Sequence, residues 1–467
     1  MDMHFDALII GSGQAAPALG VRLANAGMKV ALIEREHLGG TCVNDGCTPT
    51  KTLVASARAA HIARRAADFG VRLDGPVGID MRAVKARMES VVAESVNGLT
   101  KWLEGTAGLR VIRGEARFVG PRAVEVGGDV LEAPKVFINV GGRATLPDWP
   151  GIERVPVLTN TSVLALDTVP EHLVIVGGSY IGLEFAQIYR RFGAAVTVLE
   201  YADRVIARED VDVSREVQAI LEREGVQFVL GTRDARVEPA AGGTGVRVSL
   251  TAGGVPHQID GSHLLAAVGR RPNTDVLGLD RAGIATDARG FISVDDQLRT
   301  NVDGVWALGD VNGQGAFTHT SYNDHEIVAA NLLDGGSRRS TDRITAYALF
   351  IDPPLGRIGM TEAQVRATGR PALVGTMPMS RVSRARERGE TQGFMKVLVD
   401  AETDRLLGAA LLCIEGDEAV HALLDVMAAG APCEVIRRSV HIHPTVSELI
   451  PTLLGQLKPL PAQDART

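Results

Sequence analysis

Two cysteines, Cys42 and Cys47, lie close together in the segment GGTCVNDGCTPTK at residues 39–51. The chain has only four cysteines in 467 residues, which is too few for a disulfide scaffold. In a reducing compartment, a close pair is expected to be redox-active or to bind a metal. A redox disulfide is the favoured interpretation, and a metal site or two buried thiols are the alternatives.

The residues that follow the pair predict a helix, with Thr48 as its cap and Pro49 in its first turn. The partial positive charge at a helix N-terminus stabilises a thiolate, the form that attacks a disulfide or binds a soft metal. The two remaining cysteines, Cys413 and Cys433, do not have the spacing of a structural zinc site. We expect Cys413 to be a buried apolar side chain. The position of Cys433 at a turn leaves its role open.

A strand, a glycine turn, a helix and a second strand are predicted at residues 5–34. Gly11 allows the turn, Gly13 allows the backbone to approach a pyrophosphate, and the small Ala16 lets the helix contact the sheet. Glu34 ends the second strand, where a carboxylate can accept hydrogen bonds from ribose hydroxyls. This combination predicts a dinucleotide site; a glycine-rich turn of another α/β fold is the alternative.

The pattern returns at residues 172–200, where Gly177, Ser179 and Gly182 form the turn and Glu200 ends the second strand. Ser179 replaces the usual middle glycine, and serine is small enough to be tolerated. Two such units predict two bound dinucleotides.

The acid that ends this second unit bears on the choice of dinucleotide. Glu200 can accept hydrogen bonds from a ribose 2′-hydroxyl and would repel a 2′-phosphate, which favours NADH over NADPH. Arg204 and Arg208 follow closely and could reach a phosphate. NADPH therefore remains the alternative.

Composition limits the class of protein. The formal net charge is −7, and basic residues form no long block, so a nucleic acid is an unlikely partner. The sequence shows neither a signal peptide nor an apolar run of roughly 18 residues, so we expect no membrane association and a cytoplasmic protein.

The order of the motifs GSGQAA, GGTCVNDGCTPTK, GGSYIGLE, AVGRRPNT, ALGDVNG and HIHPTVSE resembles the class I pyridine nucleotide-disulfide oxidoreductases. These include dihydrolipoamide dehydrogenase, glutathione reductase and mercuric reductase, and the resemblance covers essentially the whole chain. It implies an α/β homodimer with two Rossmann-like domains and a C-terminal α+β dimerisation domain. The expected division is an FAD-binding domain at 1–150 and 276–342, an NAD(P)H-binding domain at 151–275, and a dimerisation domain at 343–467.

The resemblance also implies roles for individual residues. Cys42 would exchange with the substrate, and Cys47 would form a charge-transfer pair with the flavin. Lys51 would lie by flavin N5, paired with Glu184. Tyr180 would cover the nicotinamide pocket. The other expected cofactor-binding residues are Gly40, Thr41, Gly269 and Asp310, the last expected to hold the FAD ribityl chain.

His443 and Glu448 resemble the acid/base pair that disulfide-exchanging members donate to the active site of the partner subunit. The glutamate would orient the imidazole, whose ordinary pKa suits proton transfer between thiols. A surface histidine beside a proline turn is the alternative. The adjacent His441 has no third ligand partner and is left out of the expected site, so we expect no resident metal.

We predict an FAD-dependent NAD(P)H oxidoreductase that passes electrons through a Cys42–Cys47 disulfide to a small disulfide. The motifs are closest to a mercuric-reductase-like subgroup, although no cysteine follows Glu448 to hand a metal inward. Reduction of a soft ion, Hg(II) or Cu(II), is the first alternative. A non-catalytic flavoprotein subunit and a flavin oxidase without disulfide chemistry are the others.

Overall fold

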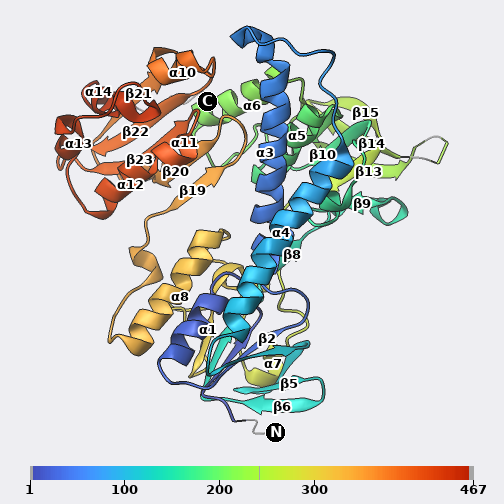
Figure 1. The fold of residues 1–467 in the computed structure, drawn as a ribbon, viewed down its shortest axis with the longest axis vertical. Helices are drawn as coiled ribbons and strands as arrows, with labels where there is room; N and C mark the ends of the chain where they lie inside the picture. The colour runs from blue at the N-terminus through green and yellow to red at the C-terminus, as the bar shows by residue number, and fades with distance from the viewer. Residues whose placement is uncertain (1–3, 241, 244, 462–467) are drawn as a thin grey trace.

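The computed structural model describes residues 4–240, 242–243 and 245–461. The chain forms three α/β bodies: the first contains the N-terminus, the second lies beside the long helix α3 (Cys47–Arg64), and the third is formed by the C-terminal part of the chain (Figure 1). Within these residues, no helix is long and apolar enough to cross a membrane. The predicted α/β class with a separate C-terminal α+β region is confirmed.

The first body is built on a five-stranded parallel sheet in the order β18-β7-β1-β2-β3. Every residue of β1 and β2 is buried, because helices cover the sheet and its strands read as continuous apolar runs. A small antiparallel sheet, β4-β5-β6, packs beside it. The bounds are β1 (Ala7–Ile10), α1 (Ala16–Asn25), β2 (Val30–Glu34), β3 (Leu109–Arg113), β4 (Ala116–Gly120), β5 (Ala123–Val126), β6 (Asp129–Glu132), β7 (Lys135–Ile138) and β18 (Val305–Ala307).

Two long helices leave this body and run along the molecule, α3 (Cys47–Arg64) and α4 (Met81–Glu104) (Figure 1). The short α2 (Gly40–Asn44) precedes them. Helix α3 packs against both α4 and the helix α5 (Tyr180–Phe192) of the second body. The start of α3 is thereby fixed between the first two bodies.

The second body repeats the arrangement of the first, with a parallel sheet in the order β12-β11-β10-β16-β9 and an antiparallel sheet β13-β14-β15. The bounds are β9 (Val157–Leu158), β10 (His172–Val176), α5 (Tyr180–Phe192), β11 (Ala195–Leu199), α6 (Val211–Arg223), β12 (Gln227–Val229), β13 (Arg233–Pro239), β14 (Val246–Ala252), β15 (Val255–Gly261) and β16 (His263–Ala266).

The chain then returns to the first body. β17 (Arg270–Pro272) pairs with β8 (Gly142–Ala144), α7 (Leu279–Ala282) packs on β4, and β18 joins the edge of the first sheet. Helix α8 (Thr318–Leu333) then packs against α1. The first body is therefore made from two separate parts of the sequence.

The third body is an antiparallel sheet in the order β19-β20-β23-β22-β21-β24, covered by short helices. The bounds are β19 (Ala346–Leu349), β20 (Leu355–Gly359), α9 (Glu362–Ala367), β21 (Ala372–Pro378), α10 (Ser383–Glu387), β22 (Phe394–Asp400), β23 (Leu406–Leu412), α11 (Gly416–Ala419), α12 (His421–Ala428), α13 (Glu434–Arg438), α14 (Ile450–Leu454) and β24 (Lys458–Pro459). Cys413 and Cys433 are fully buried in its apolar core. Cys413 is thus the buried side chain expected, and burial raises the pKa of Cys433 to about 12.

Candidate active site

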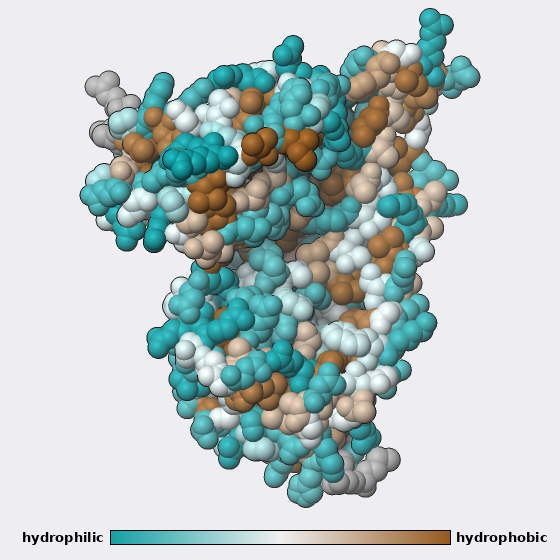
Figure 2. Space-filling model, turned by 60° about the vertical axis from the view of Figure 1, so that its left-hand side comes forward, coloured by the Kyte–Doolittle hydropathy of each residue, from teal (hydrophilic) through white to brown (hydrophobic). Residues whose placement is uncertain are grey.

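A cavity of about 800 Å³ lies where the three bodies meet. Its wall includes the first glycine turn, α2, the start of α3, the first turns of α5 and α8, and strand β19. Figure 2 shows the surface hollowed between the upper and lower parts of the molecule. Both cysteines of the pair line this cavity.

The two thiols come from neighbouring short segments. Cys42 lies in α2, and Cys47 is the first residue of α3. The hydroxyl of Thr318, at the start of α8, lies 3.0 Å from the Cys42 sulfur, to which it donates, and 3.2 Å from the Cys47 sulfur. The first residue of α8 therefore contacts both sulfurs of the pair.

The predicted cap of α3 is wrong by two residues. The helix begins at Cys47, its cap position is Gly46, and Thr48 lies inside the first turn. A side chain at position 46 would meet the carbonyl oxygen of Thr41 at 2.7 Å, so the backbone there requires glycine. The shift places the Cys47 sulfur at the positive end of the helix itself.

The two thiols differ in acidity because they share one proton. The pKa of Cys47 falls to about 6, chiefly because its sulfur accepts a hydrogen bond from Cys42, with further stabilisation from Thr318 and Lys51. The same hydrogen bond raises the pKa of Cys42, and burial raises it further. Near neutral pH the pair therefore holds one thiolate on Cys47 and one proton on Cys42. A base is needed to activate Cys42.

Lys51 and Glu184 form the ion pair that the family resemblance implies. The Lys51 ammonium lies 2.7 Å from a Glu184 carboxylate oxygen and 4.5 Å from the centre of the Phe350 ring. The other Glu184 oxygen accepts a hydrogen bond of 3.0 Å from the Phe350 backbone. Sequence reasoning missed Phe350, which follows β19 and brings the third body to this lysine.

Replacing the lysine, Lys51→Met, is expected to raise the pKa of Cys47 above about 6, because a positive charge that stabilises the thiolate is lost. The measurement is the rate of iodoacetamide alkylation of Cys47 in the reduced protein across pH, followed by peptide mass spectrometry. In the wild type the rate should rise through about pH 6, since the thiolate predominates above the pKa. The exposed Lys101→Met is the control, and an identical titration in both variants would contradict the assignment.

The glycines of the first turn pack directly against another strand end. A Cβ at Gly11 would lie 2.6 Å from the backbone oxygen of Asn139, and one at Gly13 would lie 2.6 Å from its side-chain oxygen. That side chain also accepts a hydrogen bond from the Ala16 amide at 3.2 Å. Asn139 follows β7 and was missed by sequence reasoning, because no motif marks it. The turn lines the cavity with backbone in a shape that suits a pyrophosphate.

Glu34 is the last residue of β2, and Glu200 directly follows β11 in the second body. A Glu34 oxygen accepts hydrogen bonds of 2.9 Å and 2.6 Å from the amide and hydroxyl of Ser12. A Glu200 oxygen accepts one of 2.5 Å from the amide of Gly178. In each body the acid is therefore fixed by the glycine turn.

The second turn is as tightly packed as the first. A Cβ at Gly177 would lie 2.4 Å from the Ala267 oxygen, and one at Gly182 would lie 2.0 Å from the Gly177 oxygen. Ser179 has extended backbone directly before α5 and is accommodated without a cap hydrogen bond from its side chain. The serine substitution thus leaves the turn intact.

Among the remaining expected cofactor residues, Gly40, Thr41 and Asp310 line the cavity. Asp310 lies just after β18, where burial raises its pKa, and its carboxylate is 3.7 Å from the Arg270 guanidinium. Arg270 also approaches the Thr41 hydroxyl at 3.5 Å and was missed by sequence reasoning. Gly40 and Gly269 adopt positive φ angles of 58° and 137°, which favour glycine.

Tyr180 lines the cavity at the first residue of α5. Its hydroxyl donates a hydrogen bond of 2.9 Å to Glu209. Its ring lies edge-on to Phe317 and Tyr347. The tyrosine is thus held between all three bodies.

His443 and Glu448 pair with each other but lie away from the cysteines. Their nearest side-chain atoms are 2.6 Å apart, and the histidine is 72% exposed while the glutamate is 7% exposed. Neither residue lines the cavity that contains Cys42 and Cys47 in the described part of this chain. The expected hydrogen-bonded pair therefore forms, at a place apart from the two cysteines of the same chain.

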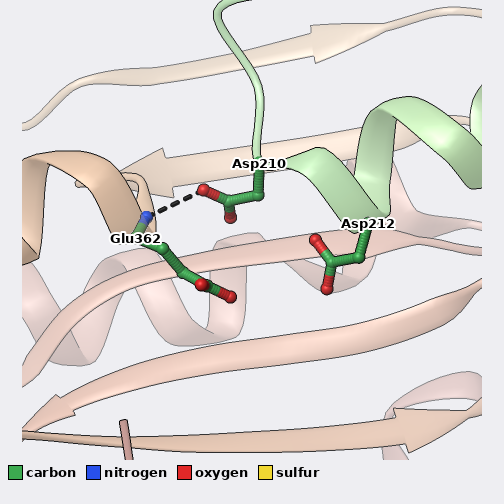
Figure 3. Close-up of side chains that lie close together, drawn as sticks. All are labelled: Asp210, Asp212 and Glu362. Carbon is green, nitrogen blue, oxygen red and sulfur yellow. Dashed lines mark hydrogen bonds between the residues drawn. The ribbon is translucent and has the colours of Figure 1, made fainter. Parts of the chain in front are cut away.

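Three acids, Asp210, Asp212 and Glu362, gather between the second and third bodies (Figure 3). The ammonium of Lys396 lies 2.9 Å, 2.6 Å and 2.9 Å from their respective carboxylates. The buried lysine thus takes the position between the acids, and the cluster is an ion-pair contact between bodies.

The chain matches two family models. Residues 5–324 match "Pyridine nucleotide-disulphide oxidoreductase", and residues 345–454 match the dimerisation domain of the same family.

Individual proteins match over nearly the whole chain. Probable pyridine nucleotide-disulfide oxidoreductase RclA of Escherichia coli is 38% identical, over 97% of this chain and 99% of that protein. Dihydrolipoyl dehydrogenase of Haloferax volcanii is 34% identical (95% and 94%), and mercuric reductase of Streptomyces lividans is 33% identical (96% and 94%). A solved structure, the "HOCl-induced flavoprotein disulfide reductase RclA from Escherichia coli", superposes with a TM-score of 0.88 at 37% identity, covering 97% of this chain and 100% of that one.

These matches agree with the motif order, the paired thiols and the two dinucleotide-type turns. The chain therefore belongs to the class I pyridine nucleotide-disulfide oxidoreductase family and is an oxidoreductase of that family.

Proposed function

We propose that this enzyme uses FAD and NAD(P)H to reduce a small disulfide through the Cys42–Cys47 dithiol. The observation that carries the proposal is the acidity of the pair: Cys47 is stabilised as a thiolate while Cys42 keeps the shared proton. The pair lines one cavity with both the first glycine turn and the Lys51–Glu184 ion pair.

The first body has the features needed to hold FAD. Gly11, Gly13 and Ala16 would present backbone to the pyrophosphate, and Glu34 would hold a ribose. Asp310 would hold the ribityl chain. Bound flavin would supply the two-electron chemistry between the dinucleotide and the dithiol. The protein would supply placement and charge, with Lys51 near the flavin and Glu184 fixing Lys51.

The reaction of the dithiol with its acceptor balances as a thiol–disulfide exchange. Deprotonated Cys42 attacks one sulfur of the acceptor, the acceptor S–S bond breaks, and the first thiol leaves with a proton. The Cys47 thiolate then attacks the Cys42 sulfur, which closes the Cys42–Cys47 disulfide and releases the second sulfur of the acceptor as a thiolate, which takes its proton from water. The acceptor is reduced by two electrons and the dithiol is oxidised.

A homodimer would complete the site. The segment around His443 carries Val440, 97% exposed, and Ile442, 77% exposed, and apolar side chains so exposed favour burial against another surface. It lies in the part of the chain that matches the dimerisation domain. Across such an interface, His443 would take the proton from Cys42 of the other subunit, with Glu448 holding the imidazole.

NADH is the proposed dinucleotide. Glu200 is held beside the second glycine turn by the Gly178 amide, and from there it would accept hydrogen bonds from a ribose 2′-hydroxyl. Arg204 is turned back onto its own loop and donates to the Ala207 oxygen at 2.7 Å. Arg233 is a nearby cation that sequence reasoning missed; its guanidinium lies 3.8 Å from the centre of the Tyr201 ring.

A second candidate acceptor is a soft metal ion, Hg(II) or Cu(II). Two thiols that face one cavity can bind such an ion directly as thiolates. Among the similar structures is one described as a Cu(II) complex of the Escherichia coli RclA protein. Because paired reduced thiols persist in a reducing compartment, we also propose a cytoplasmic location.

The proposal predicts that the purified holoenzyme oxidises NADH in the presence of a small disulfide, and faster than it oxidises NADPH. The measurement is the anaerobic loss of NADH with small disulfides, quinones and metal–thiol complexes compared side by side. Each acceptor is also titrated into enzyme whose dithiol has been reduced, and reoxidation of the dithiol is followed. Turnover with metal complexes alone would show that the acceptor is a metal ion and not a disulfide. No turnover with any acceptor would remove the proposed function.

A further inference from the structure

The turn that carries His443 is held by a neighbouring helix. Helix α10 lies at the upper edge of the third body (Figure 1). The guanidinium of Arg384, the second residue of α10, donates a hydrogen bond of 2.8 Å to the carbonyl oxygen of Pro444. Pro444 directly follows His443 in the chain. A charged side chain of α10 therefore holds the backbone next to the histidine.

The same helix also contacts the carboxylate that pairs with His443. The backbone amide of Ser383, the first residue of α10, donates a hydrogen bond of 3.3 Å to one oxygen of Glu448. The other oxygen of Glu448 lies 2.6 Å from the imidazole of His443. Two consecutive residues of α10 thus bind the backbone and the carboxylate of a single turn.

Helix α10 is itself anchored in the third body. The side chains of Val382 and Ala385 are fully buried in the apolar core of this body, which also contains Val446 from the turn. Ser383 and Arg384 lie between these two anchors in the sequence. Because moving buried apolar side chains into water is costly, the helix is a fixed support for the turn.

The imidazole depends on this support because little else surrounds it. His443 is exposed, so the backbone of the turn and the bond to Glu448 determine where its ring lies. The guanidinium of Arg384 is planar, and its second hydrogen bond, from Nε to Glu387 at 3.0 Å, fixes the direction of that plane. The donor to Pro444 is therefore itself held in place.

We propose that Arg384 is a positioning residue for the acid/base pair, and that it holds the turn so that His443 is presented to the dithiol of the other subunit. Arg384 acts through the Pro444 carbonyl and not on the reacting atoms. The inference rests on the proposed function, in which His443 is the base that activates Cys42.

The variant Arg384→Met keeps an unbranched side chain and removes its donors. The kcat with a small disulfide is expected to fall about tenfold, because a catalytic group that is displaced by a fraction of an ångström loses much of its effect. The KM should change little. The measurement is steady-state kinetics of the holoenzyme with NADH and a small disulfide. The rate of flavin reduction by NADH, followed separately by stopped flow, should equal that of the wild type.

The matched control is Arg388→Met. It removes the arginine that directly follows α10, whose partner is Glu415 at 2.8 Å. Its kcat should equal that of the wild type. If Arg384→Met fails to fold, Arg384→Gln takes its place in every comparison.

A double variant separates positioning from general damage to the fold. If Arg384 acts only through His443, Arg384→Met should cause no further loss of kcat in a protein that already carries His443→Ala. An equal tenfold loss in both backgrounds would overturn the inference, since Arg384 would then act independently of the imidazole.

Two other results would also overturn the inference alone. One is a wild-type kcat in Arg384→Met while His443→Ala is impaired, and the other is a loss confined to KM. If His443→Ala itself reduces the disulfide at the wild-type rate, the role of His443 in the proposed function is wrong instead. The two failures are therefore distinguishable.

Discussion

The variant Cys42→Ser is expected to lose disulfide-dependent NADH oxidation by at least about 10³-fold, because a serine hydroxyl cannot replace a thiolate in exchange. Cys47→Ser should lose it as well, since the mixed disulfide formed by Cys42 then has no internal thiol to resolve it. The measurement is steady-state NADH loss with a small disulfide. Mass spectrometry of the Cys47→Ser protein should detect the acceptor thiol attached to Cys42.

The matched control is Cys413→Ala, which removes a thiol that is fully buried in the third body. Its turnover should stay close to that of the wild type, because the sulfur has no route to substrate. Turnover that survives in Cys42→Ser would contradict the dithiol pathway and favour a flavin oxidase. If Cys42→Ser loses activity with the disulfide but keeps it with metal complexes, Cys42 is needed only for the disulfide reaction.

The variant His443→Ala is expected to reduce disulfide turnover by about 10²- to 10⁴-fold, the usual contribution of a general acid or base. The proton on Cys42 makes this base necessary, since the pKa of that thiol is raised. A soft metal bound by two thiolates needs no such proton transfer. Retained metal reduction together with lost disulfide reduction would therefore favour the metal acceptor.

Mixed dimers test whether His443 acts across the interface. Neither Cys42→Ser nor His443→Ala should be active alone, but a heterodimer of the two would contain one complete site. Random re-association of equal amounts gives about half heterodimers, so about one quarter of wild-type activity should return. Each variant mixed with itself is the control. If no activity returns in verified heterodimers, His443 does not act in trans.

The motifs that could be read from the sequence are those built from neighbouring residues. The two glycine turns, the acids Glu34 and Glu200, and the cysteine pair each lie within one strand–turn–helix unit, where backbone geometry requires particular residue types. The His443–Glu448 pair is also local, and the structure contains it. The family resemblance then supplied the link between Lys51 and Glu184, which are 133 residues apart.

Local patterns can still mislead by a residue or two. Thr48 has a side chain typical of a helix cap, but the helix begins at Cys47 because Gly46 packs against the Thr41 carbonyl. The contact that decides the boundary comes from the preceding helix. The sequence pattern alone does not reveal the close approach of residue 46 to the Thr41 carbonyl.

By itself, the sequence determined the family, the two dinucleotide-type units and the reactive pair, because each depends on contacts within short segments. Only the tertiary structure revealed Thr318 between the sulfurs, Phe350 over Lys51 and Glu209 behind Tyr180. These residues lie in unremarkable sequence and gain their positions when the three bodies pack together. Side chains that meet through long-range packing carry no local periodicity or spacing, so the sequence pattern could not identify them.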